Sequence, residues 1–321
     1  MTYPFLSHVE EDFRAVNDLV ELNLSSEVPL IKEIASYLIQ AGGKRLRPLL
    51  VLLCARACDY QGTHHVKLAA VIEFLHTAML LHDDVVDESN LRRGKKTVNA
   101  EWGNAASVLV GDFLHSRAFE MMVDIGDIRI MKILSRATNV VAQGEVQQLI
   151  SINNPATTET EYKEIIYRKT AMLFQAAAHI GAVIAGANQK TESALRTFGL
   201  HLGIAFQMVD DRLDYLGSSK ELGKNIGDDL AEGKVTLPLI IAMRNGTSDQ
   251  REFVESVIKK GGVENLSEII QVVKTTGALK YTAEQVKAER CNALEQLQRV
   301  ADSTFKDSMA ELLSFVVERH S

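Results

Sequence analysis

Apolar residues recur at helical spacing along almost the whole chain. Near the N-terminus, Leu19, Leu22, Ile31, Ile34 and Leu38 form one amphipathic pattern of this kind. No segment shows the sustained alternation of apolar and polar residues that is typical of a half-buried strand. The pattern therefore predicts an all-α protein.

The same periodicity predicts where the helices lie. They cover residues 49–57, 66–82, 108–123, 130–150, 159–187, 192–216 and 237–244, and more helices follow towards the C-terminus. The helices at 49–57 and 66–82 are apolar on most faces, which is typical of helices at the centre of a protein. Because no linker or repeat interrupts the pattern, residues 1–321 are predicted to form a single all-α domain.

Composition and charge exclude several classes of protein. The chain has 46% hydrophobic residues, 35 Lys+Arg and 42 Asp+Glu, which give a net charge of −7. The hydrophobic content excludes wholesale disorder. The acidic balance argues against a nucleic-acid partner, because general nucleic-acid binders usually carry a basic surplus.

The cysteines and the start of the chain indicate a cytoplasmic location. Cys54 and Cys58 lie four residues apart in an apolar stretch, and with Cys291 they form neither a disulfide framework nor a zinc motif. The first residues lack the basic start and apolar core of a signal peptide. No stretch reaches the ~20 apolar residues that a membrane span needs.

Two acidic clusters follow apolar helices. The first is DDVVD at 83–87 and the second is DDRLD at 210–214. Each places like charges one helical turn apart, which destabilises a helix unless a cation bridges the carboxylates. Oxygen ligands without Cys or His suit Mg²⁺, which often shares its coordination shell with substrate phosphates. One such cluster is often only a solvated helix end, but two copies favour binding of a metal-bound diphosphate.

Basic residues stand beside glycines around these clusters. The segment GGKRLRP at 42–48 combines a flexible turn with three cations, and Arg92 and Arg93 follow the first acidic cluster. Lys169, Lys224 and Lys234 lie further along the chain. Exposed backbone N–H groups beside Lys and Arg form a natural seat for a diphosphate group.

The set of motifs resembles the trans-isoprenyl diphosphate synthases. GGKRLRP, HDDVVDESNLRRG, FQMVDDRLDY and GKNIGDDLAEGK occur in the order and spacing of that family. IEFLHTAMLLHDDVVDESNLRRGK and NAASVLVGDFLHSRAF are especially similar to its bacterial octaprenyl diphosphate synthases. The resemblance implies one polyprenyl synthetase domain with the all-α isoprenoid synthase fold, in which helices surround a central catalytic cavity between the aspartate motifs, and a homodimer.

The resemblance also implies a reaction and a set of site residues. A Mg²⁺-dependent prenyltransferase of this kind adds isopentenyl diphosphate head-to-tail to an allylic diphosphate such as farnesyl or geranyl diphosphate. The long product would serve as a quinone side chain, with at most peripheral membrane contact when it is released.

By resemblance, the metal-bound allylic diphosphate is held by Asp83, Asp84, Asp87, Asp210, Asp211 and Asp214. Its direct contacts would be Arg92, Lys169, Lys224 and Lys234. Isopentenyl diphosphate would contact Lys44, Arg47, His76 and Arg93. The polar residues facing the reacting carbons would be Thr170 and Gln207.

Physical chemistry agrees with that reaction. The allylic C–O bond breaks heterolytically only if the charge on the leaving diphosphate is stabilised, which metal ions and cations do. The allylic cation must meet a double bond rather than water, so the cavity should be dry. The sequence shows no dedicated base, and by resemblance the departing diphosphate takes the final proton. His82, next to Asp83, is expected to have a supporting or packing role.

Product length is expected to depend on the helix that precedes the first motif. Ala78 and Met79 stand five and four residues before Asp83, about 6–8 Å along the helix axis. In short-chain relatives a bulky aromatic residue there stops elongation, whereas Ala78 leaves room. The tunnel floor would then lie deeper, at Phe119, Met122 or Val123, and an octaprenyl (C40) product is expected. Shorter (C15–C20) and solanesyl (C45) products are the alternatives.

Two further features lead to hypotheses. Arg212 stands in the second motif where the family usually has an aliphatic residue, and it is expected to point outward rather than to pair with a carboxylate. The glycine-rich stretch 217–233, which contains Lys224, is expected to be a mobile lid over bound diphosphate.

Other classes of function fit the motifs less well. A class I terpene cyclase would share the fold but would not need the GGKRLRP seat, and it usually has an Asn/Ser/Glu second motif. A non-catalytic partner subunit would have eroded aspartates, whereas both motifs are intact here. A purely structural helical protein would have no reason to place aspartate triads after apolar helices.

Overall fold

The computed structural model describes residues 4–92, 94–216, 227–262 and 264–318. Helices dominate, with 79% of the described residues helical, and the predicted all-α isoprenoid synthase fold is confirmed. Among the described residues, the strands are limited to β1 (Leu91–Arg92) and β2 (Lys95–Lys96), which pair as a short antiparallel hairpin. Helical periodicity did not predict this hairpin, because two-residue strands are too short to produce a pattern.

Internal contacts divide the chain into two compact units. The first unit comprises residues 1–138, 173–199 and 295–312. The second unit comprises residues 139–172, 200–294 and 313–321.

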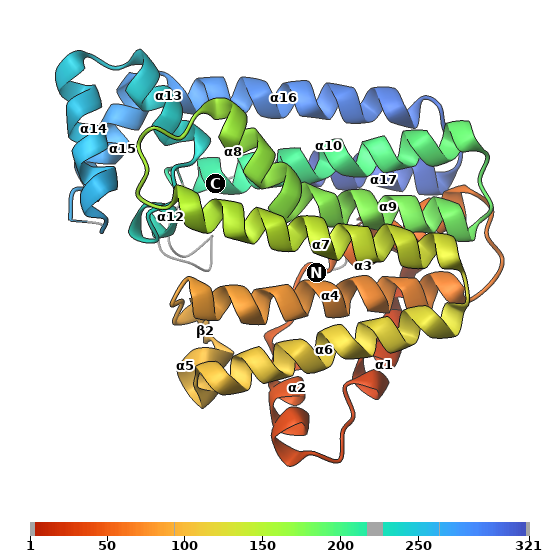
Figure 1. The fold of residues 1–321 in the computed structure, drawn as a ribbon. Helices are drawn as coiled ribbons and strands as arrows, with labels where there is room; N and C mark the ends of the chain where they lie inside the picture. The colour runs from red at the N-terminus through yellow and green to blue at the C-terminus, as the bar shows by residue number, and fades with distance from the viewer. Residues whose placement is uncertain (1–3, 93, 217–226, 263, 319–321) are drawn as a thin grey trace. The chain divides into compact units, whose positions relative to one another are not determined.

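The first unit contains the N-terminal helices and the hairpin. Its elements are a 3₁₀ helix η1 (Pro4–Val9), α1 (Glu10–Asn23), α2 (Pro29–Ala41), α3 (Leu46–Ala57), α4 (His64–Val86), β1, β2, α5 (Val98–Trp102) and α6 (Asn104–Ile125). It also includes most of α9 (Met172–Ile184) and parts of α7 (Ile128–Ser151), α10 (Gln189–Leu213), α16 (Ala278–Leu297) and α17 (Thr304–Val317). Within this unit α4 and α6, orange and yellow in Figure 1, run side by side.

The predicted central helices are central in the structure. Every residue of α3 from Leu49 to Ala55 is buried, and α4 is buried along most of its length. Gly181 lets α9 approach α3 closely, because a Cβ at this position would lie 2.7 Å from the Val51 carbonyl oxygen. α3 in turn packs against α4, and the first acidic motif lies at the end of α4.

The second unit contains the remaining helices. Its elements are the rest of α7, α8 (Glu159–Ile166), a π-helical turn η2 (Tyr167–Ala171), the rest of α10, α12 (Asp228–Ala231), α13 (Leu237–Asn245), α14 (Ser248–Lys260), α15 (Leu266–Thr275), most of α16 and the end of α17. Capping boxes begin α8 at Thr158 and α14 at Thr247, and each satisfies backbone N–H groups that the first helical turn leaves open.

Most predicted helices match observed ones within a few residues. The predicted helix 159–187 is in fact α8, the π turn and α9 in succession. The predicted break at Asn153-Asn154-Pro155 is present, and Asn153 adopts a left-handed backbone conformation (φ 56°).

Candidate active site

In the first unit, the first acidic motif occupies the C-terminal end of α4. Asp83 and Asp84 lie in the last helical turn, and Asp87 follows it with its N–H bonded to the Asp83 carbonyl at 2.8 Å. The three residues therefore lie within one turn, as the spacing predicted. Asp84 is buried, whereas Asp83 and Asp87 are half-buried.

Arg92 on β1 neutralises the buried carboxylate of Asp84. Its Nη2 and Nε atoms lie 2.7 Å and 2.8 Å from Asp84 Oδ1. Burial raises the pKa of the Asp84 carboxyl above its usual value, and the charge and hydrogen bonds of Arg92 oppose that rise. The hairpin thus brings one of the predicted diphosphate contacts directly onto a predicted metal ligand.

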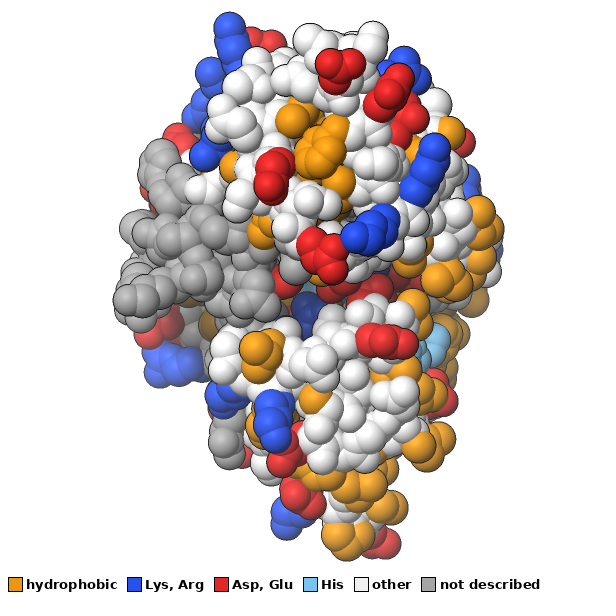
Figure 2. All heavy atoms as spheres, turned by 90° about the vertical axis from the view of Figure 1, so that its left-hand side faces the viewer, with side chains coloured by type: hydrophobic (Ala, Val, Ile, Leu, Met, Phe, Trp, Pro, Cys, Tyr) orange, Lys and Arg blue, Asp and Glu red, His pale blue; other side chains and the backbone are white. Residues whose placement is uncertain are grey.

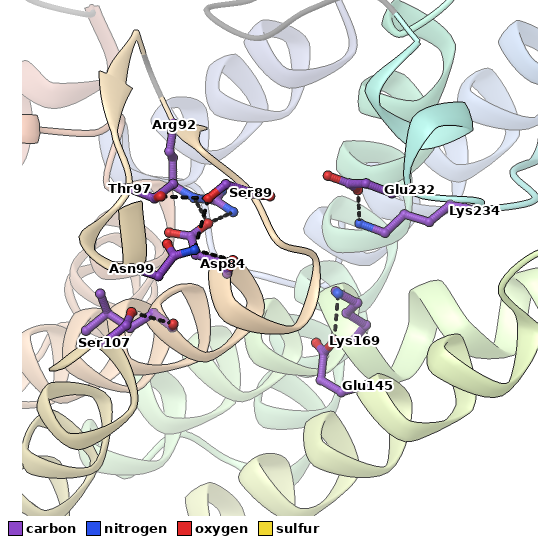
Figure 3. Close-up of polar contacts among 11 residues, drawn as sticks. Asp84, Ser89, Arg92, Thr97, Asn99, Ser107, Glu145, Lys169, Glu232 and Lys234 are labelled. Carbon is purple, nitrogen blue, oxygen red and sulfur yellow. Dashed lines mark hydrogen bonds and ion pairs between the residues drawn. The ribbon is translucent and has the colours of Figure 1, made fainter. Parts of the chain in front are cut away.

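A set of polar side chains fixes the end of α4 through its backbone (Figure 3). The Asn99 amide donates to the Asp84 and Ser89 carbonyl oxygens, at 3.0 Å and 3.1 Å. The Thr97 hydroxyl also donates to the Ser89 carbonyl, at 2.6 Å, and the Ser107 hydroxyl donates to Leu81 O, at 2.8 Å. These bonds tie the end of α4 and the residues that follow it to Thr97, α5 and α6.

The predicted isopentenyl diphosphate seat is partly assembled in the first unit. Arg47 Nη1 lies 3.0 Å from His76 Nε2, and the Arg47 guanidinium stacks 4.3 Å from the centroid of the Phe174 ring. Lys44 is exposed in the loop before α3. The structure therefore brings Arg47 and His76 together, while Arg93 lies outside the described residues.

His82 turns away from the carboxylates of its own helix. Its Nε2 atom lies 3.2 Å from the Val108 carbonyl oxygen and 3.4 Å from Asp112 Oδ1, both on α6. Gly111 makes this approach possible, because a Cβ there would lie 2.4 Å from His82 Nε2. The contacts agree with the expected packing role.

The residues proposed to control product length differ in exposure. Ala78 and Met122 are buried, and Met79 and Phe119 are half-buried. Val123, however, exposes 58% of its surface on the outer face of α6. Its position is that of a surface residue, unlike the other floor candidates.

In the second unit, the second acidic motif ends α10 in a more enclosed setting. Asp211 and Asp214 are buried, and Asp210 is half-buried. The Asp214 Oδ2 atom accepts a hydrogen bond from the backbone N–H of Asp229 at 3.2 Å. The GDDLAEGK segment therefore supports the second motif through α12.

A chain of hydrogen bonds links the predicted polar residues to this motif. The Thr170 hydroxyl donates to Gln207 Oε1 at 2.8 Å, and Gln207 Nε2 donates to Asp211 Oδ1 at 2.7 Å. The Tyr162 hydroxyl donates to the other carboxylate oxygen of Asp211 at 2.5 Å. Thr170 lies on the π-helical turn η2, a distortion that is frequent at functional sites.

The environment of Asp211 favours its neutral form. Burial raises the pKa of the Asp211 carboxyl to about 8, and the nearby charge of Asp229 adds to the rise. The hydrogen bonds from Tyr162 and Gln207 oppose it but bring no positive charge. A cation placed against this carboxyl would therefore stabilise its ionised form.

Two of the predicted diphosphate lysines already pair with glutamates in the second unit. Lys169 Nζ lies 2.6 Å from Glu145 Oε2, and Lys234 Nζ pairs with Glu232 (Figure 3). Lys224 and positions 217–226 of the expected lid lie outside the described residues. Arg212 is half-buried, and burial lowers the pKa of its guanidinium. Its outward orientation stays a prediction.

Comparison with known proteins identifies the family of this chain. The polyprenyl synthetase family model matches residues 28–275. The chain belongs to the polyprenyl synthetase family. It is similar to the octaprenyl diphosphate synthase of Escherichia coli (strain K12), with 45% identity over 96% of each chain. It is also similar to the all-trans-nonaprenyl-diphosphate synthase (geranyl-diphosphate specific) of Rhodobacter capsulatus, with 44% identity over 98% of this chain and 97% of the relative.

Solved structures give the same result. The polyprenyl synthase from Caulobacter crescentus CB15, complexed with calcium and isoprenyl diphosphate, superposes with a TM-score of 0.95 and 43% identity over 99% of this chain and 97% of that chain. A decaprenyl diphosphate synthase from Rhodobacter capsulatus superposes with a TM-score of 0.93 and 46% identity over 98% of each chain. The protein is therefore a prenyltransferase of the long-chain, all-trans polyprenyl diphosphate synthase type.

Polyprenyl synthetases use isoprenyl diphosphates and depend on a divalent metal ion. The donor set of both motifs fits a hard divalent cation, because every predicted ligand is a carboxylate and none is Cys or His. Among the described residues, no three acidic, His or Cys side chains converge closely enough to form a complete metal cage.

Sequence reasoning missed several residues that support the site. These are Thr97, Asn99, Glu145, Tyr162, Asp229 and Glu232. Asp229 and Glu232 lie within the GDDLAEGK segment, so their neighbourhood carried a signal. Tyr162 lies 49 positions from Asp211, and no local pattern connects the two.

None of the helices in the described ranges has the length and apolar character required to cross a membrane.

Proposed function

We propose that this chain is an octaprenyl (C40) diphosphate synthase that extends farnesyl or geranyl diphosphate with isopentenyl diphosphate, for the side chain of a quinone. The observation that carries the proposal is the presence of two intact aspartate motifs in a chain 45% identical to an octaprenyl synthase over 96% of its length. Residues 1–321 would act as one polyprenyl synthetase domain.

The first unit would provide part of the allylic site and the isopentenyl site. Asp83, Asp84 and Asp87 present their carboxylates within one turn at the end of α4. Arg47 and His76, 3.0 Å apart, would bind the diphosphate group of isopentenyl diphosphate and thereby orient the double bond of its isopentenyl chain for attack. Arg92 would give up one of its two hydrogen bonds to Asp84 and donate it to a diphosphate oxygen instead.

The second unit would complete the chemistry. Lys169 and Lys234 would stabilise charge on the departing diphosphate. The Thr170 hydroxyl and the Gln207 amide, linked at 2.8 Å, would present oxygen atoms to the developing allylic cation. Magnesium ions, when bound by the carboxylates of each motif, would supply further charge neutralisation for the leaving group.

Product length is proposed from the wall residues. Ala78 is buried and small, and Met79 is flexible, so neither closes the path beside α4 as an aromatic residue would. The Rhodobacter capsulatus relatives, which are named as nonaprenyl and decaprenyl synthases, favour C45 or C50 as the second candidate.

We also propose a homodimer that uses the outer face of α6. Val108, Leu109 and Val123 expose 37%, 66% and 58% of their surface along this helix, and apolar side chains are frequent on the lower right of Figure 2. Self-association would remove this apolar stripe from water. Sedimentation analysis should give a dimer, and Leu109→Glu should shift it to monomer.

The thiols of Cys54, Cys58 and Cys291 are free, and we propose that the protein works in a reducing compartment such as the cytoplasm.

A direct assay tests the proposed function. The purified protein is incubated with isopentenyl diphosphate, farnesyl or geranyl diphosphate and Mg²⁺, and the dephosphorylated products are separated by reversed-phase chromatography. A C40 product is expected. C45 or C50 products would favour the second candidate, and cyclic hydrocarbons or no product would contradict the proposal.

A further inference from the structure

Glu145 and Glu232 each hold a lysine that the proposed function assigns to the diphosphate. The Lys169 and Lys234 side chains are only 18% and 17% exposed, and their partners Glu145 and Glu232 are 28% and 23% exposed. Both ion pairs are therefore shielded from water on most sides. In such surroundings a charge interaction is stronger than at an open surface.

The fold fixes the first of these pairs. Gly144 on α7 lies so close to η2 that a Cβ there would be 2.7 Å from Arg168 Cβ and 2.8 Å from the Lys169 backbone nitrogen. The residue after Gly144 is Glu145, and its carboxylate meets Lys169 Nζ at 2.6 Å. The close approach of the two backbones thus places the Glu145 carboxylate beside the Lys169 ammonium group. The pair is therefore fixed by the fold and is not a chance contact between two mobile side chains.

The backbone also fixes the second pair. Between Glu232 and Lys234, Gly233 adopts a left-handed conformation (φ 71°), and its carbonyl accepts a hydrogen bond from the Asn153 N–H at 2.9 Å. The Lys234 N–H donates to the Asp229 carbonyl at 2.8 Å. A Cβ on Gly233 would lie 2.3 Å from Asn153 Oδ1, so the turn is held against the loop that follows α7.

We propose that Glu145 and Glu232 are internal counter-anions, positioning residues that hold Lys169 and Lys234 when no diphosphate is bound and compete with diphosphate for them. This inference rests on the proposed function. Each condensation leaves one inorganic diphosphate, which must depart before the lengthened chain can react again. A carboxylate beside each lysine lowers the affinity of that lysine for inorganic diphosphate and so speeds the release of the diphosphate.

The proposal predicts a gain in binding when the glutamates are neutralised. Glu145→Gln and Glu232→Gln keep the side-chain size but remove the competing charge. Each variant should bind inorganic diphosphate with Mg²⁺ at least about two- to fivefold more tightly in isothermal titration calorimetry, because this is the range expected even for an exposed ion pair. The double variant should show the product of the two effects, and its kcat should fall because diphosphate leaves slowly.

Two controls separate charge competition from other causes. Glu252→Gln on α14 removes the same charge from an exposed position in the same unit and should leave the Kd for diphosphate unchanged. In a Lys169→Gln background, Glu145→Gln should no longer tighten binding, because the lysine for which it competes is gone. Melting temperatures show whether each variant is folded, and the two glutamates provide independent tests if one variant is not.

The outcomes are distinct. Unchanged or weaker diphosphate binding in folded Glu145→Gln and Glu232→Gln would overturn the inference and leave the glutamates as purely structural partners. If the wild-type protein makes the C40 product, the proposed function stands whatever the variants do. If the wild-type protein makes none, the proposed function fails, whereas tighter diphosphate binding by the variants would still support counter-anion competition.

Discussion

Asp84 in the first motif and Asp211 in the second are both buried, with 3% and 2% of their surface exposed, and both end long helices. Asp84 receives two hydrogen bonds from the cationic guanidinium of Arg92. Asp211 receives its bonds from Tyr162 and Gln207, which are neutral.

This difference shows that the same spacing of aspartates does not give the same electrostatics. In the first motif the protein itself supplies a positive charge for the buried carboxylate. In the second motif the partners orient the carboxyl but leave its charge uncompensated, so burial raises the pKa of Asp211 to about 8. Asp211 therefore has a greater need for an external cation than Asp84 has.

The largest expected effect is the loss of catalysis when either motif is broken. Asp83→Ala and Asp210→Ala should each lower kcat by about 100-fold or more, because each removes a carboxylate that helps to place charge against the leaving group. Excess chelator should abolish turnover of the wild-type protein. The exposed Asp249→Ala on α14 is a control that should keep normal activity, and turnover in chelator would contradict the metal requirement of both motifs.

The next effect tests whether Arg92 neutralises Asp84. Arg92→Gln should lower the free energy of unfolding by about 1–2 kcal/mol, because it leaves a buried carboxylate without its cation. The expected loss is below that of a fully buried pair, since the Arg92 side chain is 38% exposed. Thermal denaturation checks this, with Arg251→Gln at the exposed Arg251–Glu255 pair as the control. Equal melting temperatures for Arg92→Gln and wild type would remove the contrast between the two motifs.

The raised pKa of Asp211 predicts a pH dependence of stability in the metal-free protein. In the unfolded chain this carboxyl loses its proton near its ordinary value of 3.8, whereas in the folded protein it keeps the proton up to about pH 8. The unfolded state therefore binds fewer protons between these values, and the contribution of Asp211 to stability falls as pH rises through this window and is constant above it.

Asp211→Asn isolates that contribution, since the amide carries no charge and can still pair with Tyr162 and Gln207. With chelator present, the melting temperature of the variant relative to wild type should rise by a few degrees between pH 5 and pH 8 and then level off. A difference that does not change with pH would contradict the assignment of a buried, uncompensated carboxyl.

The contrast also shows how far sequence reasoning reaches. Helical periodicity predicted α4 and α10, and the spacing of the acids predicted that each cluster lies within one turn, because both depend on local geometry. Arg92 was named as a diphosphate contact, but its bond with Asp84 depends on the β1–β2 hairpin, which no pattern predicted. Tyr162 reaches Asp211 from α8, and such long-range contacts depend on tertiary packing that a single sequence does not encode locally.

The smallest expected effect concerns the support of the first motif by Asn99. The Asn99 amide donates to the carbonyls of Asp84 and Ser89, and therefore fixes the backbone that carries the motif without touching its carboxylates. Asn99→Ala should lower the free energy of unfolding by about 1 kcal/mol, the usual worth of such hydrogen bonds. Because the end of α4 would then move more freely, the Mg²⁺ concentration needed for half-maximal activity should rise while the KM for isopentenyl diphosphate stays near normal.

Asn99→Asp should be the more harmful of the two substitutions at this position, because a carboxylate would face two carbonyl oxygens in place of an N–H donor. Thermal denaturation and a Mg²⁺ titration of activity measure both variants, and Ser107→Ala, which removes one bond to Leu81 O in the preceding turn, serves as the comparison. If Asn99→Ala changed neither stability nor the Mg²⁺ requirement, the bonds of Arg92, Thr97 and Ser107 would hold the end of α4 without help from Asn99. The difference between the two motifs would then lie entirely in the charge of their partners.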